Sequence, residues 1–372
     1  MSAVDQAEPL AKGLARRGYR LALGLRTWLS ELTSGGGASP RLYYAGARAG
    51  SHGGPRLKVS KLGEAFPEHP WTYNLVYVLS AGPYPPPAVL RRLQGRGIPV
   101  IANQNGVYYP GWYAGDWEAE NRRMADPYLL ADHVFYQSEF CRRSAERFLG
   151  ARQGPGEVLY NAVDTSRFRP QERPRDDGAP FVFLVAGKVP AHQAYRLEAA
   201  VHGLAEARQR GLDARLVIAG VIDASARGRA QATAEAVDVG SHVTFTGPYT
   251  QAAAPALFGG ADAFVLTTHN DACPSAVIEA MACALPVVYV RSGGVPELVG
   301  ADAGVGVETG DAWDGPRSPD PSELGAAMIE VAGRRAAFAV AARSRAVERF
   351  DIGAWYERHR QVFQSLLEAR RG

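Results

Sequence analysis

The stretch Asn270–Gly300, NDACPSAVIEAMACALPVVYVRSGGVPELVG, decides the fold of the C-terminal half of the chain. It contains an apolar helix pattern at Ser275–Cys283 and a short β-branched run at Val287–Val290. Another apolar run, Ala263–Leu266, comes directly before it. A strand, a helix and a strand at this spacing predict a βαβ unit and therefore a parallel sheet.

The same alternation extends on both sides of this stretch. In the first half, the patterns predict strands at 41–47, 73–79 and 98–102 and helices at 55–66 and 88–93. In the second half, they predict strands at 181–186, 215–219 and 243–245 and a helix at 195–208. We therefore expect an α/β protein with two doubly wound halves that face each other across a cleft. Ligands of such sheets bind outside the carboxyl ends of the strands.

Proline and charge mark the expected boundary between the halves, QERPRDDGAP at 171–180. The last segment repeats Trp355, Val362, Phe363, Leu366 and Leu367 on one helical face, which must pack on something. The expected parts are an N-terminal helix and linker (1–40), a first domain (41–170) that also receives the C-terminal helix (352–372), and a second domain (171–351).

The composition limits the classes of function. The chain has 372 residues, a formal net charge of +3 and a pI of about 8.7, which is too mild a charge to favour nucleic acid. Three scattered cysteines give neither a disulfide framework nor a zinc-type spacing. Without a secretory pattern or an apolar run of roughly 18 residues, we expect a cytoplasmic protein.

The segment Leu10–Leu32 allows two interpretations. It carries five basic residues among leucines and a tryptophan. A basic amphipathic helix can lie on an anionic membrane, here the inner membrane surface. Alternatively, the helix packs on its own domain or on a second subunit.

Two carboxylates, Asp271 and Glu279, lie eight positions apart around the predicted start of the helix at Ser275. Glu279 has apolar neighbours on both sides, and a charge there is costly unless something polar meets it. A ligand with hydroxyl groups would serve, and so would a partner in a structural ion pair. Asp271 would lie beside the anion-attracting helix start, or simply interact with the helix dipole.

Gly187 and Lys188 directly follow the predicted strand FVFLVA. A small residue and a cation at the carboxyl end of a strand suit a diphosphate, and His192 and Arg196 follow within two turns. The alternative is a solvated surface lysine.

Two further segments are candidates for binding. Gly50–Gly54 follows the first strand and allows close approach of the backbone to a ligand, or forms a plain turn. Asn103–Trp117 is crowded with aromatic residues, which suit sugar rings or a loop packed on the core. No P-loop and no Asp-x-Asp pair occurs in the sequence.

Together these residues resemble the retaining GT-B glycosyltransferases of the GT4-like group. Asp271–Val299 is similar to the E-x7-E signature of that family, with its EAMA helix and GG-P-E turn. The run LYNAVDTSRFRP at 159–170 resembles the family segment NGVDxxxF-x-P. Most of the chain beyond residue 155 shares the resemblance, whereas 41–150 matches more loosely.

The resemblance implies a GT-B fold with two Rossmann-like domains, and the transfer of a sugar with retained anomeric configuration and no metal or cofactor. The donor would be a UDP- or GDP-sugar, and the acceptor a saccharide, a glycolipid or a small molecule, as in polysaccharide biosynthesis. Glu279 would bind the ribose, Asp271 would face the donor sugar, and Lys188 would neutralise the diphosphate. The remaining expected site residues are Asn105 near the reacting bond, Gly53, Gly54, His192, Arg196, Cys273, Pro274 and Ser275 around the donor, and Tyr108, Tyr109, Trp112 and Tyr113 toward the acceptor.

The chain departs from the family pattern at three places. The first acid of the signature is Asp271 rather than glutamate, Lys188 stands where arginine is usual, and Asn105 lies where a histidine is often found. Two other functions therefore stay open, a non-catalytic protein that binds sugar nucleotides or glycans and a nucleotide-sugar epimerase. A membrane-surface scaffold built on Leu10–Leu32 is a further alternative.

Overall fold

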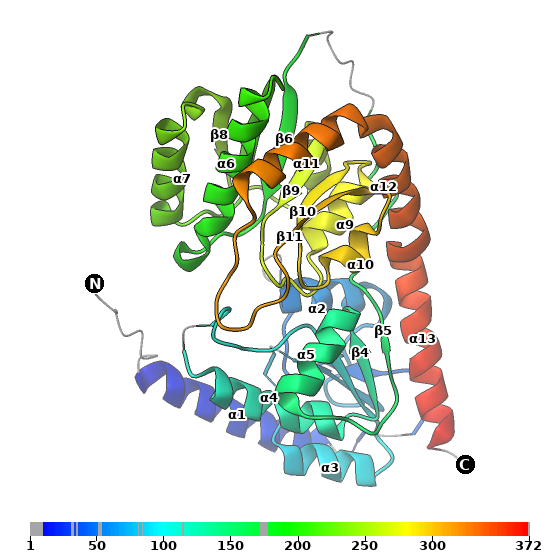
Figure 1. Cartoon of the computed structure of the whole chain (residues 1–372). Coiled ribbons are helices and arrows are strands. Elements are labelled where there is room, and N and C mark those ends of the chain that lie inside the picture. Colours follow the sequence, from blue (N-terminus) through cyan, green and yellow to red (C-terminus); the bar gives the residue numbers. More distant parts are fainter. Residues whose placement is uncertain are drawn as a thin grey trace. The chain divides into compact units, whose positions relative to one another are not determined.

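The structure, a computed structural model, describes residues 10–30, 33–34, 36–50, 54–80, 82–83, 85–113, 115–171 and 178–370. The chain divides into two compact units (Figure 1). Unit 1 comprises Met1–Tyr160 and Ala354–Gly372, and unit 2 comprises Asn161–Gly353. The chain therefore leaves unit 1 once and returns to it once.

The division comes earlier in the chain than the expected linker, of which residues 172–177 lie outside the described part. The reason is a pairing within unit 2, between the segment after Asn161 and the end of the last helix of the unit. The N–H of Val163 donates to the carbonyl of Phe350 at 2.9 Å, and the N–H of Ile352 donates to the carbonyl of Val163 at 3.0 Å. Residues 161–170 thus belong to unit 2.

Six parallel strands form the sheet in the described part of unit 2, in the order β11-β10-β9-β6-β7-β8. Their bounds are β6 Phe181–Ala186, β7 Ala214–Ala219, β8 Val243–Gly247, β9 Ala263–Leu266, β10 Val287–Arg291 and β11 Gly304–Glu308. Every residue of β6 and β9 is buried, which explains why these strands read as continuous apolar runs. The predicted bounds of both strands are confirmed.

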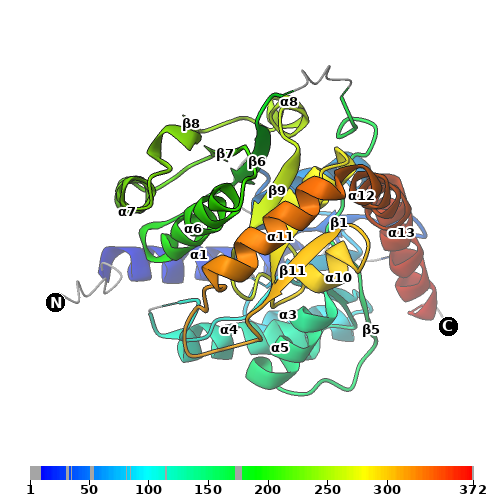
Figure 2. The same cartoon turned by 45° about the horizontal axis from the view of Figure 1, so that its top comes forward.

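Helices cover both faces of this sheet. They are α6 Tyr195–Gln209, α7 Ala224–Ala236, α8 Ala254–Gly259, α9 Ser275–Ala282, α10 Val295–Val299, α11 Pro321–Gly333 and α12 Arg335–Phe350, with short 3-10 turns η1 Ala191–Gln193 and η2 Gly240–His242. Figure 2 shows α6 and α11 side by side over one face, where they share a core with Phe183 and Val265. Phe264, which precedes Val265 in β9, points to the opposite face of the sheet. There its ring contacts that of Phe258 on α8, which lies beside α9.

The described part of unit 1 contains a five-stranded parallel sheet in the order β1-β2-β3-β4-β5. The strands are β1 Leu42–Tyr43, β2 Leu75–Leu79, β3 Val100–Gln104, β4 His133–Tyr136 and β5 Gly156–Val158, and the helices between them are α2 Gly54–Ala65, α3 Pro87–Gly95, α4 Trp117–Leu130 and α5 Glu139–Leu149. We expected double winding in both halves. In the described part of unit 1 the strand order instead follows the chain without a reversal, whereas unit 2 is doubly wound.

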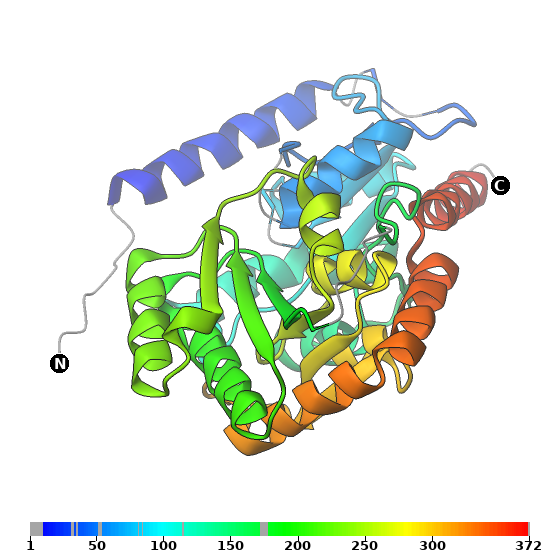
Figure 3. The same ribbon diagram turned by 90° about the horizontal axis from the view of Figure 1, so that it is seen from above.

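Helix α1, Leu10–Ser30, precedes the sheet of unit 1 and lies beside α3. Figure 3 shows α1 at the margin of unit 1, with no other described segment of that unit on its outer side. The glycine-rich stretch after it, part of the expected linker, makes hydrogen bonds to unit 1 where the structure describes it. The buried side-chain amide of Asn74 donates to the carbonyls of Gly36 and Ser39, each at 3.0 Å.

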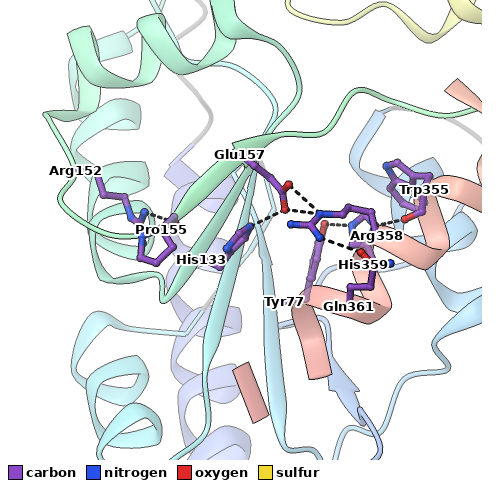
Figure 4. A network of polar contacts seen from close by, with 9 residues as sticks. All are labelled: Tyr77, His133, Arg152, Pro155, Glu157, Trp355, Arg358, His359 and Gln361. Carbon is purple, nitrogen blue, oxygen red and sulfur yellow. Dashed lines mark hydrogen bonds and ion pairs between the residues drawn. The ribbon is translucent and has the colours of Figure 1, made fainter. Parts of the chain in front are cut away.

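Helix α13, Ile352–Ala369, returns to unit 1 and buries the predicted apolar face, with Trp355, Val362, Phe363 and Leu367 buried. His359 lies on the same face without solvent exposure (Figure 4). One of its ring nitrogens, Nδ1, must donate to the carbonyl of Trp355 at 2.8 Å, so Nε2 accepts from the Tyr77 hydroxyl at 3.0 Å. At the solvent side, Arg358 donates to Glu157 on β5 at 2.9 Å.

Candidate functional site

The candidate site lies at the carboxyl edge of the sheet of unit 2, where β6 and β9 are neighbours. From β6 the chain builds β7 and β8 outward on one side, and then returns to build β9, β10 and β11 on the other side. The order therefore reverses between β6 and β9, and such a switch point is where α/β sheets bind ligands. Lys188 follows β6 and Asp271 follows β9, so two predicted site residues flank the reversal.

The turn after β6 depends on two glycines. Gly187 has a φ of 132°, and its N–H donates to the carbonyl of Ala219 at 3.0 Å. At Gly220 after β7, a Cβ would lie 1.8 Å from the carbonyl oxygen of Gly187, so no side chain fits there. Gly187 was predictable from its place after an apolar strand, whereas nothing in the sequence around Gly220 indicated this contact. The Lys188 side chain is exposed, as both the diphosphate and the surface-lysine interpretations require.

Arg196 is a buried cation in the first turn of α6, with 8% of its surface exposed. One guanidinium nitrogen donates to the Gln193 side chain at 3.0 Å and to the carbonyl of Lys188 at 3.2 Å. Burial lowers the pKa of Arg196, and the nearby Asp271 carboxylate opposes that shift. We expected Arg196 and His192 to add donors for a diphosphate. His192 is exposed on η1, and one nitrogen of Arg196 holds the 188–193 turn.

Asp271 lies in the loop between β9 and α9. Its side chain accepts from the N–H of Cys273 at 3.2 Å, and its carbonyl accepts from the N–H of Gly294 at 2.8 Å. Burial raises the pKa of the carboxyl, and the positive charge of Arg196 offsets part of the rise. The loop thus places the Asp271 carboxyl in the electrostatic field of a buried cation, which opposes the effect of burial.

The start of α9 offers fewer donors than we expected. Pro274 is the residue before the helix and has no N–H, and the N–H of Cys273 already donates to Asp271. Cys273 and Pro274 are both buried, whereas Ser275 is partly exposed. The backbone donors for an anion therefore begin at Ser275.

Glu279 lies in the middle of α9 with 5% of its surface exposed, as the apolar helix predicted. Its charge acts on two neighbours, Tyr249 in the loop after β8 and Cys283 at the end of α9. Burial first, and the Glu279 carboxylate second, raise the pKa of each of these groups to about 12. The negative charge of Glu279 thus reaches both the loop after β8 and the end of α9.

A network of hydrogen bonds between loops supports this site, and no sequence pattern predicted it. The ring of His269 donates from Nε2 to the carbonyl of Gly310 at 2.8 Å, and the side chain of Asn270 donates to the carbonyl of Ala312 at 2.6 Å. Asp311 in turn accepts from the N–H of Gly293 at 3.0 Å. Hydrogen bonds therefore join the loops after β9, β10 and β11 to one another.

Asn161, the first residue of unit 2, fixes the same loop from another direction. Its side-chain amide donates to the carbonyl of Cys273 at 2.7 Å, and its backbone N–H donates to the Cys273 sulfur at 3.3 Å. The run LYNAVD contained this residue, but sequence alone gave no reason to connect it with Cys273.

The remaining predicted residues belong to unit 1. Asn105 follows β3, and its N–H donates to the Ser80 hydroxyl at 3.0 Å. Gly53 lies outside the described residues, and Gly54 begins α2.

The predicted acceptor aromatics divide into exposed and buried rings. Trp112 and Tyr113 are 39% and 37% exposed, and Tyr108 packs its ring 5.0 Å from that of Tyr113. Tyr109 is buried and stacks on Phe148. An exposed aromatic surface is therefore present at Trp112 and Tyr113, whereas Tyr109 belongs to the core.

Within the described ranges, no group of three or more His, Cys, Asp or Glu side chains is placed to hold a metal ion. In the same residues, every helix is too short or too polar to span a bilayer.

Sequence models of two families match the chain in succession. Residues 6–167 match "Glycosyltransferase Family 4", and residues 167–314 match "Glycosyl transferases group 1". The chain belongs to the GT4-like glycosyltransferases. Its two parallel sheets with alternating helices are the GT-B fold of these enzymes.

Solved structures of other proteins share this glycosyltransferase fold at low sequence identity. The sucrose-phosphate synthase of Thermosynechococcus elongatus is 16% identical with a TM-score of 0.69, over 88% of this chain and 98% of its own. The Anabaena protein Alr3699/HepE in complex with UDP is 18% identical with a TM-score of 0.60, over 79% of each chain. The lipopolysaccharide galactosyltransferase WaaB is 15% identical with a TM-score of 0.55, over 77% of this chain and 73% of its own. No curated protein sequence matches the chain.

Proposed function

We propose that this glycosyltransferase moves a sugar from a nucleoside diphosphate sugar to a saccharide, glycolipid or small-molecule acceptor, with retention of the anomeric configuration and without a metal ion. The observation that carries the proposal is the convergence of Lys188, Asp271 and Ser275 on the switch point between β6 and β9. A cation, a carboxylate and a helix start at one sheet edge suit a donor that combines phosphates with a hydroxylated sugar.

The phosphate end of the donor would lie between the β6 turn and the start of α9. Negative charge builds on the phosphate oxygens as the bond to the anomeric carbon breaks. The Lys188 ammonium and the backbone N–H groups from Ser275 onward would stabilise that charge. No protein nucleophile is needed if the departing phosphate accepts the proton of the acceptor on the same face of the sugar.

The two acids would have separate tasks. Asp271, in its bonded loop, would accept hydrogen bonds from the donor sugar, and the positive charge of Arg196 favours its ionised form. Glu279, deeper in α9, would accept hydrogen bonds from the ribose hydroxyls. Asn105 would act near the reacting bond, and Trp112 and Tyr113 offer ring faces to an acceptor.

The direct test is the substitution Glu279→Gln, which keeps the size of the side chain and removes its charge. We expect at least a tenfold loss of affinity for the nucleoside diphosphate, because a hydrogen bond to a charged group contributes about 1.5–3 kcal/mol. UDP is the first nucleotide to use, since the HepE relative was solved with it. Calorimetric titration measures the affinity, and unchanged binding would remove the ribose role of Glu279.

Two controls keep this test specific. Glu330→Gln alters an exposed acid on α11 of the same unit and should leave nucleotide affinity unchanged. Turnover of UDP-sugars by the unmodified protein separates the enzyme from a binding protein. Tight nucleotide binding with no transfer and no slow donor hydrolysis would favour the non-catalytic alternative.

A further inference from the structure

Helix α1 has two faces of different character. Leu23, Thr27 and Ser30 are buried against unit 1, and the Ser30 hydroxyl donates to the Tyr73 hydroxyl at 3.0 Å. The expectation that this helix packs on its own domain is therefore correct for one face.

The opposite face is apolar and exposed. Leu21, Leu25, Trp28 and Leu29 are 73%, 59%, 47% and 47% exposed, at spacings of four, seven and eight residues that place them on one side of the helix. Of the twelve large apolar side chains that are exposed in the described residues, five lie on α1, counting Tyr19. Such a concentration marks an interaction surface rather than scattered surface residues.

The charge of the helix indicates what covers this face. The 21 residues of α1 include five basic residues and no acidic one. Arg26 lies 4.9 Å from the ring of Trp71, which is itself 51% exposed. An anionic lipid surface matches both the charge and the apolar strip, whereas a second copy of α1 would bring five like charges against five.

We propose that the exposed face of α1 binds in the interface of an anionic membrane, with Leu21, Leu25, Trp28 and Leu29 inserted among the acyl chains. The net positive charge of the α1 sequence would add electrostatic attraction to the anionic headgroups. This inference goes beyond the transfer reaction and does not depend on it, since α1 belongs to unit 1 and the donor residues belong to unit 2.

The test is sedimentation of the full chain with vesicles of phosphatidylcholine alone or of phosphatidylcholine with about one third phosphatidylglycerol. We expect binding to the anionic vesicles, little binding to the neutral ones, and a loss of binding as salt is raised, because salt screens the charge. The double variant Leu21→Glu/Leu25→Glu should bind at least tenfold more weakly.

The matched control is Val340→Glu/Val347→Glu on α12. These side chains are 73% and 42% exposed and receive the same two negative charges. Equal loss in both double variants would reduce the effect to net charge and overturn the proposal, as would unchanged binding of the α1 variant or equal binding to neutral vesicles. If the unmodified protein ignores vesicles and the α1 variant instead converts a dimer to a monomer in sedimentation velocity, the face contacts a second copy and the proposal is wrong.

Discussion

At the scale of single residues, the Asp271 loop depends on a glycine without a side chain. Gly293 follows β10 with a φ of 66°, and a Cβ there would lie 2.4 Å from the carbonyl oxygen of Asp271. Gly310 follows β11 with the same φ of 66°, but a Cβ there would meet no atom within 4 Å. The two glycines therefore have the same left-handed backbone conformation, but only Gly310 has room for a side chain.

This pair gives a sharp prediction. Gly310→Ala should cost only the backbone term of roughly 1–2 kcal/mol in unfolding free energy, with transfer activity within a few-fold of the original. Gly293→Ala should cost more and lower turnover at least tenfold, because the collision displaces Asp271. Urea denaturation and steady-state kinetics of the two variants measure these effects, and equal activities would show that the position of Asp271 does not matter.

The burial or exposure of a charged residue was predictable where that residue stands among apolar neighbours in the sequence. Glu279 in an apolar helix and Lys188 after an apolar strand stand out in the sequence, and the structure buries the first and exposes the second as expected. The burial of Arg196 near Asp271 and the hydrogen bond from Asn161 to Cys273 were not predictable, since each brings together residues far apart in the chain.

At the scale of elements, the buried parallel strands were the elements that the sequence predicted best. Strands β6 and β9 are apolar runs bounded by turn residues, and their predicted bounds agree with the structure. Helix α7 was missed because its alanine-rich sequence gives little contrast between faces. Helix α12 was also missed, although Phe338, Ala342, Ala346 and Phe350 recur on one buried face. Strand β1 is two residues long rather than the expected seven-residue run, since pairing with β2 ends at Tyr43.

Helix α13 gives unit 1 a predictable sensitivity to acid. Burial lowers the pKa of His359 to about 3, below its ordinary value of about 6.5. Below pH 6.5 the unfolded chain takes up a proton at this site that the folded unit refuses. The unfolding free energy should therefore fall by about 1.4 kcal/mol per pH unit as the pH decreases from about 6.5 toward 3.

The variant His359→Gln should lose part of this dependence. Urea denaturation at pH 7 and pH 5, followed by tryptophan fluorescence, measures it, and five of the six tryptophans belong to unit 1. His242→Gln on η2 of unit 2 is the control. If His359→Gln destabilises as steeply between the two pH values as the original, the buried histidine is not the source.

At the scale of the whole molecule, each of the two units has its own sheet, so we expect two unfolding transitions. The proposed donor residues Lys188, Asp271 and Glu279 all belong to unit 2, so a nucleotide should stabilise the transition of that unit first. In a thermal-shift panel of UDP, GDP, ADP and their sugars, a ligand at 100 times its dissociation constant should add about 2.7 kcal/mol. A panel in which no nucleotide shifts either transition would contradict the proposed donor site.

The return of α13 to unit 1 also determines when that unit can finish folding during translation. Unit 1 lacks helix α13, with its buried residues Trp355 and Phe363, until all of Asn161–Gly353 has been translated. At roughly 5–20 residues per second, that interval lasts on the order of ten to forty seconds. During that interval the rings of Tyr77 on β2 and Phe135 on β4 lack the cover of Phe363 and His359, so a chaperone that binds apolar surface during synthesis would find a target there.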